Sequence, residues 1–191
     1  MRKLLKIIIC IITVFVSFVY IADFPENGGT DKDIILRRNY IISSLDQSGP
    51  FFKSHDVEFT GEWTLVTYSM ASFALTNIAM SHPDLSKESA EIIARWIDIC
   101  LSFEIRQFDE AAWQENPLDE SVMQKDEGHI GYYGHLNLML GCYGLLANDG
   151  KFNGLHSKIS QAIAKRMRRY PHRHVETYPA QNYPPDSILP V

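Results

Sequence analysis

The stretch HIGYYGHLNLMLGCYGLL, residues 129–146, is apolar on every side when it is wound into a helix. A helix without a polar face has to be buried on all sides. A second stretch, residues 62–80, has the same character and carries no charge after Glu62. We therefore predict two buried helices, at residues 132–147 and 62–80.

Amphipathic segments follow both buried stretches. Residues 87–108 and 155–170 repeat apolar side chains at helical spacing opposite charged ones, and Ser86 is the expected N-cap of the first segment. A broad apolar face predicts another helix at residues 31–45. A long loop is predicted at residues 109–127, which contain seven carboxylates and one lysine. No segment predicts a strand.

The alternation of buried and amphipathic helices decides the fold class. Antiparallel helical hairpins that form an inner and an outer ring produce this order, whereas an orthogonal helical bundle is the simpler alternative. A closed toroid of six hairpins needs roughly twice this length. The sequence therefore predicts an all-α domain over residues 31–191, part of an α/α toroid, and we interpret it as the N-terminal fragment of a longer ancestral domain.

The N-terminus predicts a membrane anchor. Residues 7–22 are apolar and uncharged, and residues 4–22 suffice to cross a bilayer if Lys6 reaches the headgroups. A cleaved signal peptide is the alternative, but Tyr20 at −3 of a cut after Ala22 disfavours it. Basic residues before the segment and acidic residues after it place the domain on the extracytoplasmic side, in the periplasm or at the cell surface. Residues 1–22 form the anchor and 23–30 a linker.

Charge and cysteine usage narrow the possible partners. The chain has 18 basic and 23 acidic residues, three of the basic ones in the anchor, so the domain is acidic and nucleic acid is not an expected partner. Cys100 and Cys142 lie in apolar helical patterns and are expected as buried free thiols, with a disulfide as the alternative. The sequence contains no phosphate-cradling glycine loop, nucleophile elbow or paired CxxC, and we expect no cofactor.

Candidate catalytic residues lie at the start of a buried helix and in a proline-rich loop. His129 precedes the helix, where an imidazole facing a cavity could transfer protons, although packing at a helix start is the alternative. Glu176 and Asp186 form a candidate acid and base pair, with plain solvation as the alternative. Candidate substrate-binding hydroxyls are those of Tyr132, Tyr133, Tyr178 and Tyr183, although aromatic residues in such a helix are commonly core.

Two further patterns give weaker evidence for a binding site. His172, His174 and Glu176 alternate as metal ligands would in an extended segment, but the spacing arises easily by chance, so we expect no metal. Lys165, Arg166, Arg168, Arg169 and Arg173 form a basic cluster. This cluster could contact phosphate or anionic lipid, or it could simply complement a helix C-terminus.

The stretch from His129 to Leu146, followed by Asn148-Asp149 and Phe152, resembles the inner helix of the linalool dehydratase/isomerase-like family. The loop Glu176-Thr177-Tyr178-Pro179 and Tyr183-Pro184-Pro185-Asp186 is similar to that family's inner loop, except that Ser187 stands where an Asn is usual. The resemblance covers roughly residues 60–187. It implies an (α/α)6 barrel with a cavity at its mouth, where polar groups on loops before inner helices act as acid and base.

Two functions follow as hypotheses. The first is an enzyme, or a remnant of one, that acts by acid and base chemistry on a small hydroxylated or sugar-like ligand, lyase/isomerase-like or glycosidase-like. The second is a non-catalytic helical module that binds a partner through uncovered inner helices, including a second copy of itself. Exposed apolar area on residues 62–80 or 132–147 would favour the second hypothesis.

Overall fold

The computed structural model describes residues 30–46, 57–170, 172 and 174–183. The chain divides into two compact units, residues 1–37 and 38–191, and the border falls within α2 (Asp31–Leu45). Helices are the regular secondary structure of the described residues, which include no strand and only an isolated bridge between Tyr178 and Gln181. The predicted all-α class is confirmed. No described helix is long and apolar enough to cross a bilayer, and the predicted anchor at residues 4–22 lies outside the described residues.

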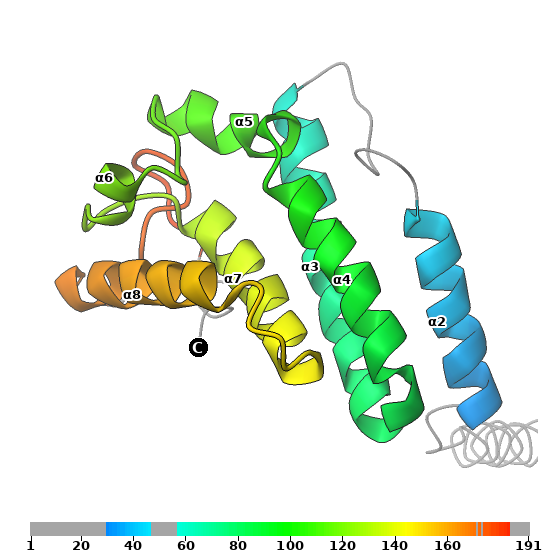
Figure 1. Ribbon diagram of the computed structural model, residues 1–191. Helices are drawn as coiled ribbons and strands as arrows, with labels where there is room; N and C mark the ends of the chain where they lie inside the picture. The colour runs from blue at the N-terminus through cyan, green and yellow to red at the C-terminus, as the bar shows by residue number, and fades with distance from the viewer. Residues whose placement is uncertain (1–29, 47–56, 171, 173, 184–191) are drawn as a thin grey trace, which may run out of the picture. The chain divides into compact units, whose positions relative to one another are not determined.

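The first hairpin consists of α3 (Val57–Ser81) and α4 (Ser86–Cys100), joined through the short 3-10 helix η1 (Pro83–Leu85). Figure 1 shows the two long helices side by side. Helix α3 begins five residues before the predicted start. The prediction that Ser86 caps the next helix is wrong, because η1 runs directly into α4 and leaves Leu85 at the N-cap position.

The predicted helix at residues 87–108 is in fact two helices. Helix α4 ends at Cys100, and α5 (Phe103–Trp113) begins after Ser102, whose extended backbone (φ −67°, ψ 152°) interrupts the helical path. Residues 109–113 therefore belong to α5 and not to a loop. The remaining acidic segment contains the short helix α6 (Glu120–Met123).

The second hairpin consists of α7 (Ile130–Leu146) and α8 (Asn153–Arg169). Helix α7 packs against α3, α4 and α8. Its first eleven residues are buried apart from the half-buried Leu138, which confirms that this helix lies inside the domain. Among its side chains, Ile130, Tyr132, Tyr133, Leu136 and Met139 are completely inaccessible. The core of the domain therefore surrounds α7.

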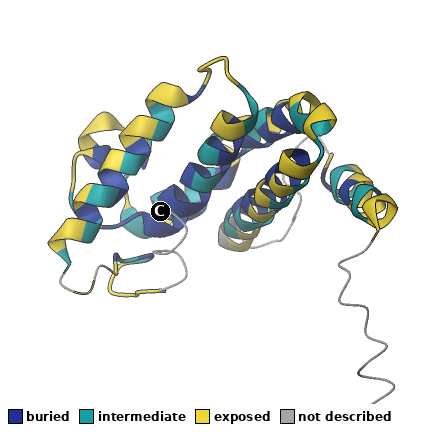
Figure 2. Ribbon diagram, turned by 90° about the horizontal axis from the view of Figure 1, so that it is seen from below, coloured by how far each residue is buried: buried dark blue, intermediate teal, exposed yellow. Residues whose placement is uncertain are grey.

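Helix α3 is buried on one side only, as the alternating colours along the helices in Figure 2 illustrate. Leu65, Tyr68 and Leu75 are in the core. Five large apolar side chains of the same helix are 41–66% exposed, namely Phe59, Trp63, Met70, Phe73 and Met80. The prediction that α3 is buried on all sides is wrong, because no described element covers the face that carries these residues.

Buried polar groups between α3 and α7 are satisfied locally. The hydroxyls of Ser72 and Thr76 donate to the carbonyls of Tyr68 and Ser72, one turn earlier, at 2.7 and 2.9 Å. Ser69 Oγ lies 2.7 Å from His135 Nδ1. His135 is thus held by a partner inside the core. Cys100 and Cys142 are buried free thiols, as expected.

Candidate functional site

His129 is the centre of the candidate site, directly before α7. Its backbone is left-handed (φ 62°), as is that of Gly128 (φ 74°), and its side chain is completely buried. Two consecutive positive φ angles turn the chain sharply into α7. A Cβ at position 128 would lie 2.9 Å from the Trp113 ring, so this position requires glycine for both conformation and space.

Arg166 of α8 holds this turn in place. Its guanidinium is completely buried and donates from Nε to the carbonyls of Glu127 and Gly128, each at 3.0 Å. It also donates to Val122 and Met123 in α6, at 3.0 and 3.3 Å. One arginine therefore ties the end of α6 and the turn before His129 to α8, since its fork of donors can serve several carbonyls at once.

Asp109 approaches His129 from α5. Its Oδ2 lies 2.6 Å from His129 Nδ1, and both side chains are inaccessible, at 1% and 0%. Burial raises the pKa of the Asp109 carboxyl, and the hydrogen bond to His129 opposes that shift. Oδ1 has no hydrogen-bond partner within the described part of the chain. His129 and Asp109 thus form a buried hydrogen-bonded pair, and the Asp109 carboxyl keeps one unsatisfied acceptor.

Glu115 connects the ring to the surface. Its Oε1 lies 3.2 Å from His129 Nε2, and Lys125 donates to its other oxygen. Burial raises the pKa of Glu115, but the hydrogen bonds from Lys125 and His129 outweigh it and the net shift is downward. The Glu115 side chain is 24% exposed. A chain of titratable groups therefore runs from solvent through the imidazole to Asp109.

Aromatic rings enclose the imidazole. The ring centroids of Trp113 and Tyr133 lie 5.2 and 5.6 Å from that of His129. Trp113 Nε1 donates to the Thr177 carbonyl at 3.3 Å, and the Ile130 amide donates to the Glu176 carbonyl at 3.5 Å. The loop after α8 thus passes beside the start of α7. Among the predicted catalytic residues, the structure brings His129 and the backbone of Glu176 together.

The other predicted site residues take different places. The hydroxyls of Tyr132 and Tyr133 donate to the carbonyls of Cys100 and Pro117, at 3.0 and 2.6 Å, and burial raises the pKa of both phenols. The Glu176 side chain is half-buried. Tyr178 and Tyr183 contact each other edge to face at 6.4 Å, and Tyr183 is 51% exposed. Asp186 lies outside the described residues.

Sequence reasoning missed Asp109, Glu115 and Arg166 as partners of His129. The sequence predicts a long acidic loop at Asp109 and Glu115, whereas α5 continues through residue 113 and the Asp109 side chain is buried. The signal that could have found them is the run of seven carboxylates so close to a histidine. The sequence places Arg166 in a basic cluster, although on α8 this residue lies on the buried stripe with Ile159, Ala162 and Ile163.

A second candidate surface is the exposed stripe of α3, which we define as residues 59, 63, 66, 70, 73, 77 and 80. Intervals of four and three residues alternate along it without exception. That spacing is the heptad pattern of helices that pair in a coiled coil. Met80 and Phe73 of the stripe also line an open apolar hollow of about 380 Å³ between α3, α7 and α8. The stripe therefore has the pattern of a helix-packing surface.

No cluster of three or more potential metal ligands occurs among the described side chains, which include His172, His174 and Glu176. No family model, curated protein or solved structure matches the chain.

Proposed function

We propose that this protein is a membrane-anchored helical binding module that associates with a second copy of itself through the α3 stripe. The observation that carries the proposal is a stripe with heptad spacing over most of a 25-residue helix. Five of its seven members are exposed large apolar residues, Val66 is half-buried and Asn77 is polar. Exposed apolar positions on a monomeric surface are scattered and lack such a period. A continuous stripe is typical of a surface that packs against another helix.

The size of the stripe suits a dimer. Large side chains bury about 150–250 Å² each. Because Phe59, Trp63, Met70, Phe73 and Met80 are roughly half exposed, they leave on the order of 500 Å² per copy. Two copies together reach the roughly 1,000 Å² that a specific interface needs.

The chemistry of the stripe suits a second copy better than a charged partner. Helix α3 has no charged residue after Glu62, so two copies meet here without like-charge repulsion in an otherwise acidic domain. Asn77 is the one polar member of the stripe. A single polar residue at such a position fixes the register between paired helices, because its amide is satisfied in one alignment only.

Sedimentation of the full chain in mild detergent tests this proposal. Phe73→Asp places two carboxylates in the interface, which costs several kcal/mol, so we expect the dissociation constant to rise at least about a hundredfold. Phe103→Asp is the matched control, since Phe103 is equally large and 59% exposed on α5 outside the stripe. A monomeric wild type, or equal dissociation constants for the two variants, would contradict the proposal.

The membrane and topological parts of the proposal rest on the sequence. Residues 4–22 supply the anchor, and the charges on either side of it place the domain on the extracytoplasmic face. The two hairpins, with α3 against α7, are compatible with neighbouring inner helices of an α/α toroid. We propose that the domain is a partial toroid in which α3 lacks the neighbour that a closed ring would provide.

A second candidate function is acid and base chemistry at His129, and the linked groups Asp109, His129 and Glu115 favour it. Glu115 is the group that a small hydroxylated ligand can reach, while His129 relays a proton and Asp109 orients the ring. Such a site is lyase/isomerase-like or glycosidase-like in chemistry. It ranks second because the imidazole is completely buried and both its nitrogens already face carboxylates.

Ligand-induced shifts of the Trp113 indole NMR signal test the second candidate. Small alcohols and monosaccharides are expected to shift this signal in the wild type and to shift it less in Glu115→Gln, which keeps the shape and removes the charge. Glu110→Gln is the control, because Glu110 pairs with Arg106 and does not face His129. Equal shifts in the two variants, or none in the wild type, would refute a ligand site at Glu115.

A further inference from the structure

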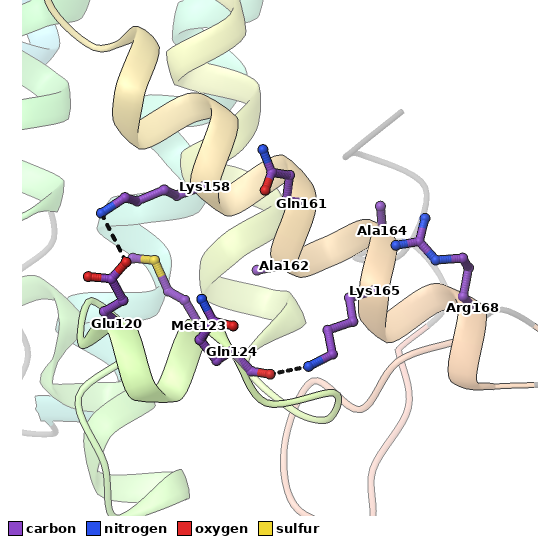
Figure 3. A pocket seen from close by; sticks show the side chains of 9 residues that line it. All are labelled: Glu120, Met123, Gln124, Lys158, Gln161, Ala162, Ala164, Lys165 and Arg168. Carbon is purple, nitrogen blue, oxygen red and sulfur yellow. Dashed lines mark hydrogen bonds and ion pairs between the residues drawn. The ribbon is translucent and has the colours of Figure 1, made fainter.

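Two hollows of similar volume adjoin α8 and differ in their lining. Figure 3 shows the first, of about 330 Å³ between α6 and α8, where Lys158 pairs with Glu120 at 3.5 Å. In the same hollow Lys165 donates to the Gln124 carbonyl, so two of its cations are matched within the domain. The second is the apolar hollow of about 380 Å³ between α3, α7 and α8, whose described lining includes no lysine, arginine or carboxylate. An uncharged, largely apolar group is therefore its matching occupant.

The apolar hollow lies beside one half of the α3 stripe only. Three stripe members of the C-terminal half line it, namely Phe73, Asn77 and Met80. The N-terminal half instead carries the aromatic rings of Phe59 and Trp63, which are both half exposed. The stripe thus has its largest ring at one end and a hollow beside the other end, so each end has the shape that the opposite end lacks.

The position of Met70 relates the two ends. Trp63 lies seven residues before Met70, and Asn77 lies seven residues after it. In an antiparallel pair centred on Met70, Trp63 of one copy faces Asn77 of the other, and the whole stripe is covered. A two-fold axis repeats this contact, because residues that meet across such an interface do so twice. Both hollows then receive an indole ring.

Parallel pairing would separate the large ring from the hollow. Each residue would face its own counterpart, so that Trp63 meets Trp63 at one end and Asn77 meets Asn77 at the other. The two α3 N-termini and their Glu62 carboxylates would also lie side by side, which adds like-charge repulsion. Shape and charge therefore both favour the antiparallel pair.

The polar groups of the hollow suit an indole. The Trp63 Nε1–H group has no hydrogen-bond partner within the described part of the chain. An indole N–H usually finds a partner when the ring is buried. The hollow offers the Asn77 amide oxygen and the His156 imidazole as acceptors. Burial lowers the pKa of His156, so its ring is neutral at pH 7 and keeps one acceptor nitrogen.

We propose that two copies of the chain pair antiparallel through α3 and that Trp63 of each copy inserts into the apolar hollow of the other. The volume of the hollow is within the range of about 300–1,000 Å³ that is usual for ligand pockets, so one ring system has room there. Tryptophan in such a pocket is a typical anchor of protein interfaces. This inference rests on the proposed self-association and adds its orientation and its anchor.

Disulfide formation between two different cysteine variants tests the orientation. Trp63→Cys and Asn77→Cys are made in the full chain with Cys10→Ser, which leaves only the buried Cys100 and Cys142. We expect an equal mixture to form a mixed cross-linked dimer, and neither variant to cross-link with itself. In the antiparallel pair the two residues 63 lie about 21 Å apart, whereas a disulfide spans Cα atoms less than about 7 Å apart.

Leu145→Asp tests the hollow itself. Leu145 lines the hollow from α7, outside the α3 stripe, and is 71% exposed, so the change does not disturb the core. Because a carboxylate there faces the buried indole, the dissociation constant measured by sedimentation should rise at least about tenfold. Phe103→Asp, outside both the stripe and the hollow, is the matched control and should leave it unchanged.

The outcomes separate this inference from the self-association on which it rests. A wild-type dimer in which each cysteine variant cross-links with itself, or in which the mixture does not cross-link, would overturn the antiparallel pair. A wild-type dimer with equal dissociation constants for Leu145→Asp and Phe103→Asp would overturn insertion into the hollow. Both results would leave pairing through α3 intact, whereas a monomeric wild type would overturn both proposals together.

Discussion

Helices α3 and α7 look alike in sequence and differ in their surroundings. Both are apolar around the whole circumference, and they pack against each other. Helix α7 is enclosed by α3, α4 and α8, whereas α3 keeps an exposed stripe with Phe73 half exposed. An all-apolar helix thus indicates that partners are required on every side. It does not guarantee that one domain supplies them.

The largest expected effect concerns the buried end of α7. His129→Ala leaves the Asp109 carboxylate buried without its partner and opens a cavity, and loss of one member of a buried pair costs about 3–5 kcal/mol. Chemical denaturation of the full chain measures the loss. Because the two side chains interact directly, adding Asp109→Asn to His129→Ala should cost less than the sum of the single changes. Simple additivity would contradict the proposed pair.

A matched pair of truncations tests the comparison directly. Leu136→Ala in α7 removes a completely buried side chain and is expected to cost about 2–5 kcal/mol. Phe73→Ala in the α3 stripe is expected to cost less than about 1 kcal/mol in dilute protein, where association contributes little. Denaturant midpoints at low protein concentration check this. Equal losses would mean that the α3 stripe is covered within one chain.

Gly128→Ala tests the turn that begins α7. The new Cβ would adopt φ near 74° and approach Trp113 to 2.9 Å. Strain of this kind costs about 1–3 kcal/mol. Gly154→Ala in α8 is the control, since a Cβ there meets no atom within 4 Å. A destabilised Gly154→Ala, or an unaffected Gly128→Ala, would refute the account of the turn.

The smallest expected effect is a pH dependence of stability that arises from the Glu115 carboxylate. Its folded pKa lies below the ordinary value of 4.5, so its ionised form stabilises the fold above that pH. The wild type should therefore be more stable than Glu115→Gln near neutral pH, and the difference should vanish as pH falls through the folded pKa. Denaturation midpoints at stepped pH values measure it. A difference that grows toward acid would contradict the hydrogen bonds assigned to this carboxylate.

The sequence predicts helices well where periodicity is strong. Both hairpins and the buried α7 follow from apolar patterning, and the ends of α7 and α8 agree within two residues. The break between α4 and α5 was not predictable, because apolar spacing runs through residues 101–102 without interruption. There the extended Ser102 backbone redirects the chain, and that choice depends on the packing of α5 against α3.

The candidate site was predictable only in its central residue. His129 stands out because it precedes an apolar helix, but its partners Asp109 and Glu115 come from residues up to 20 positions earlier. Which carboxylate of an acidic segment turns inward depends on where α5 ends. The α3 stripe was likewise predictable only in part. Its heptad spacing can be recognised in the sequence, but its exposure depends on tertiary packing.

Disulfide trapping at the centre of the α3 stripe tests the central claim most directly. Met70 lies near the midpoint of the stripe, so two copies of α3 meet there whether they pair parallel or antiparallel. In a Cys10→Ser background, Cys100 and Cys142 are buried and Met70→Cys supplies the accessible thiol. Self-association through α3 predicts rapid formation of a cross-linked dimer by Met70→Cys and not by Glu91→Cys, on the exposed face of α4. Equal cross-linking rates at the two positions would contradict it.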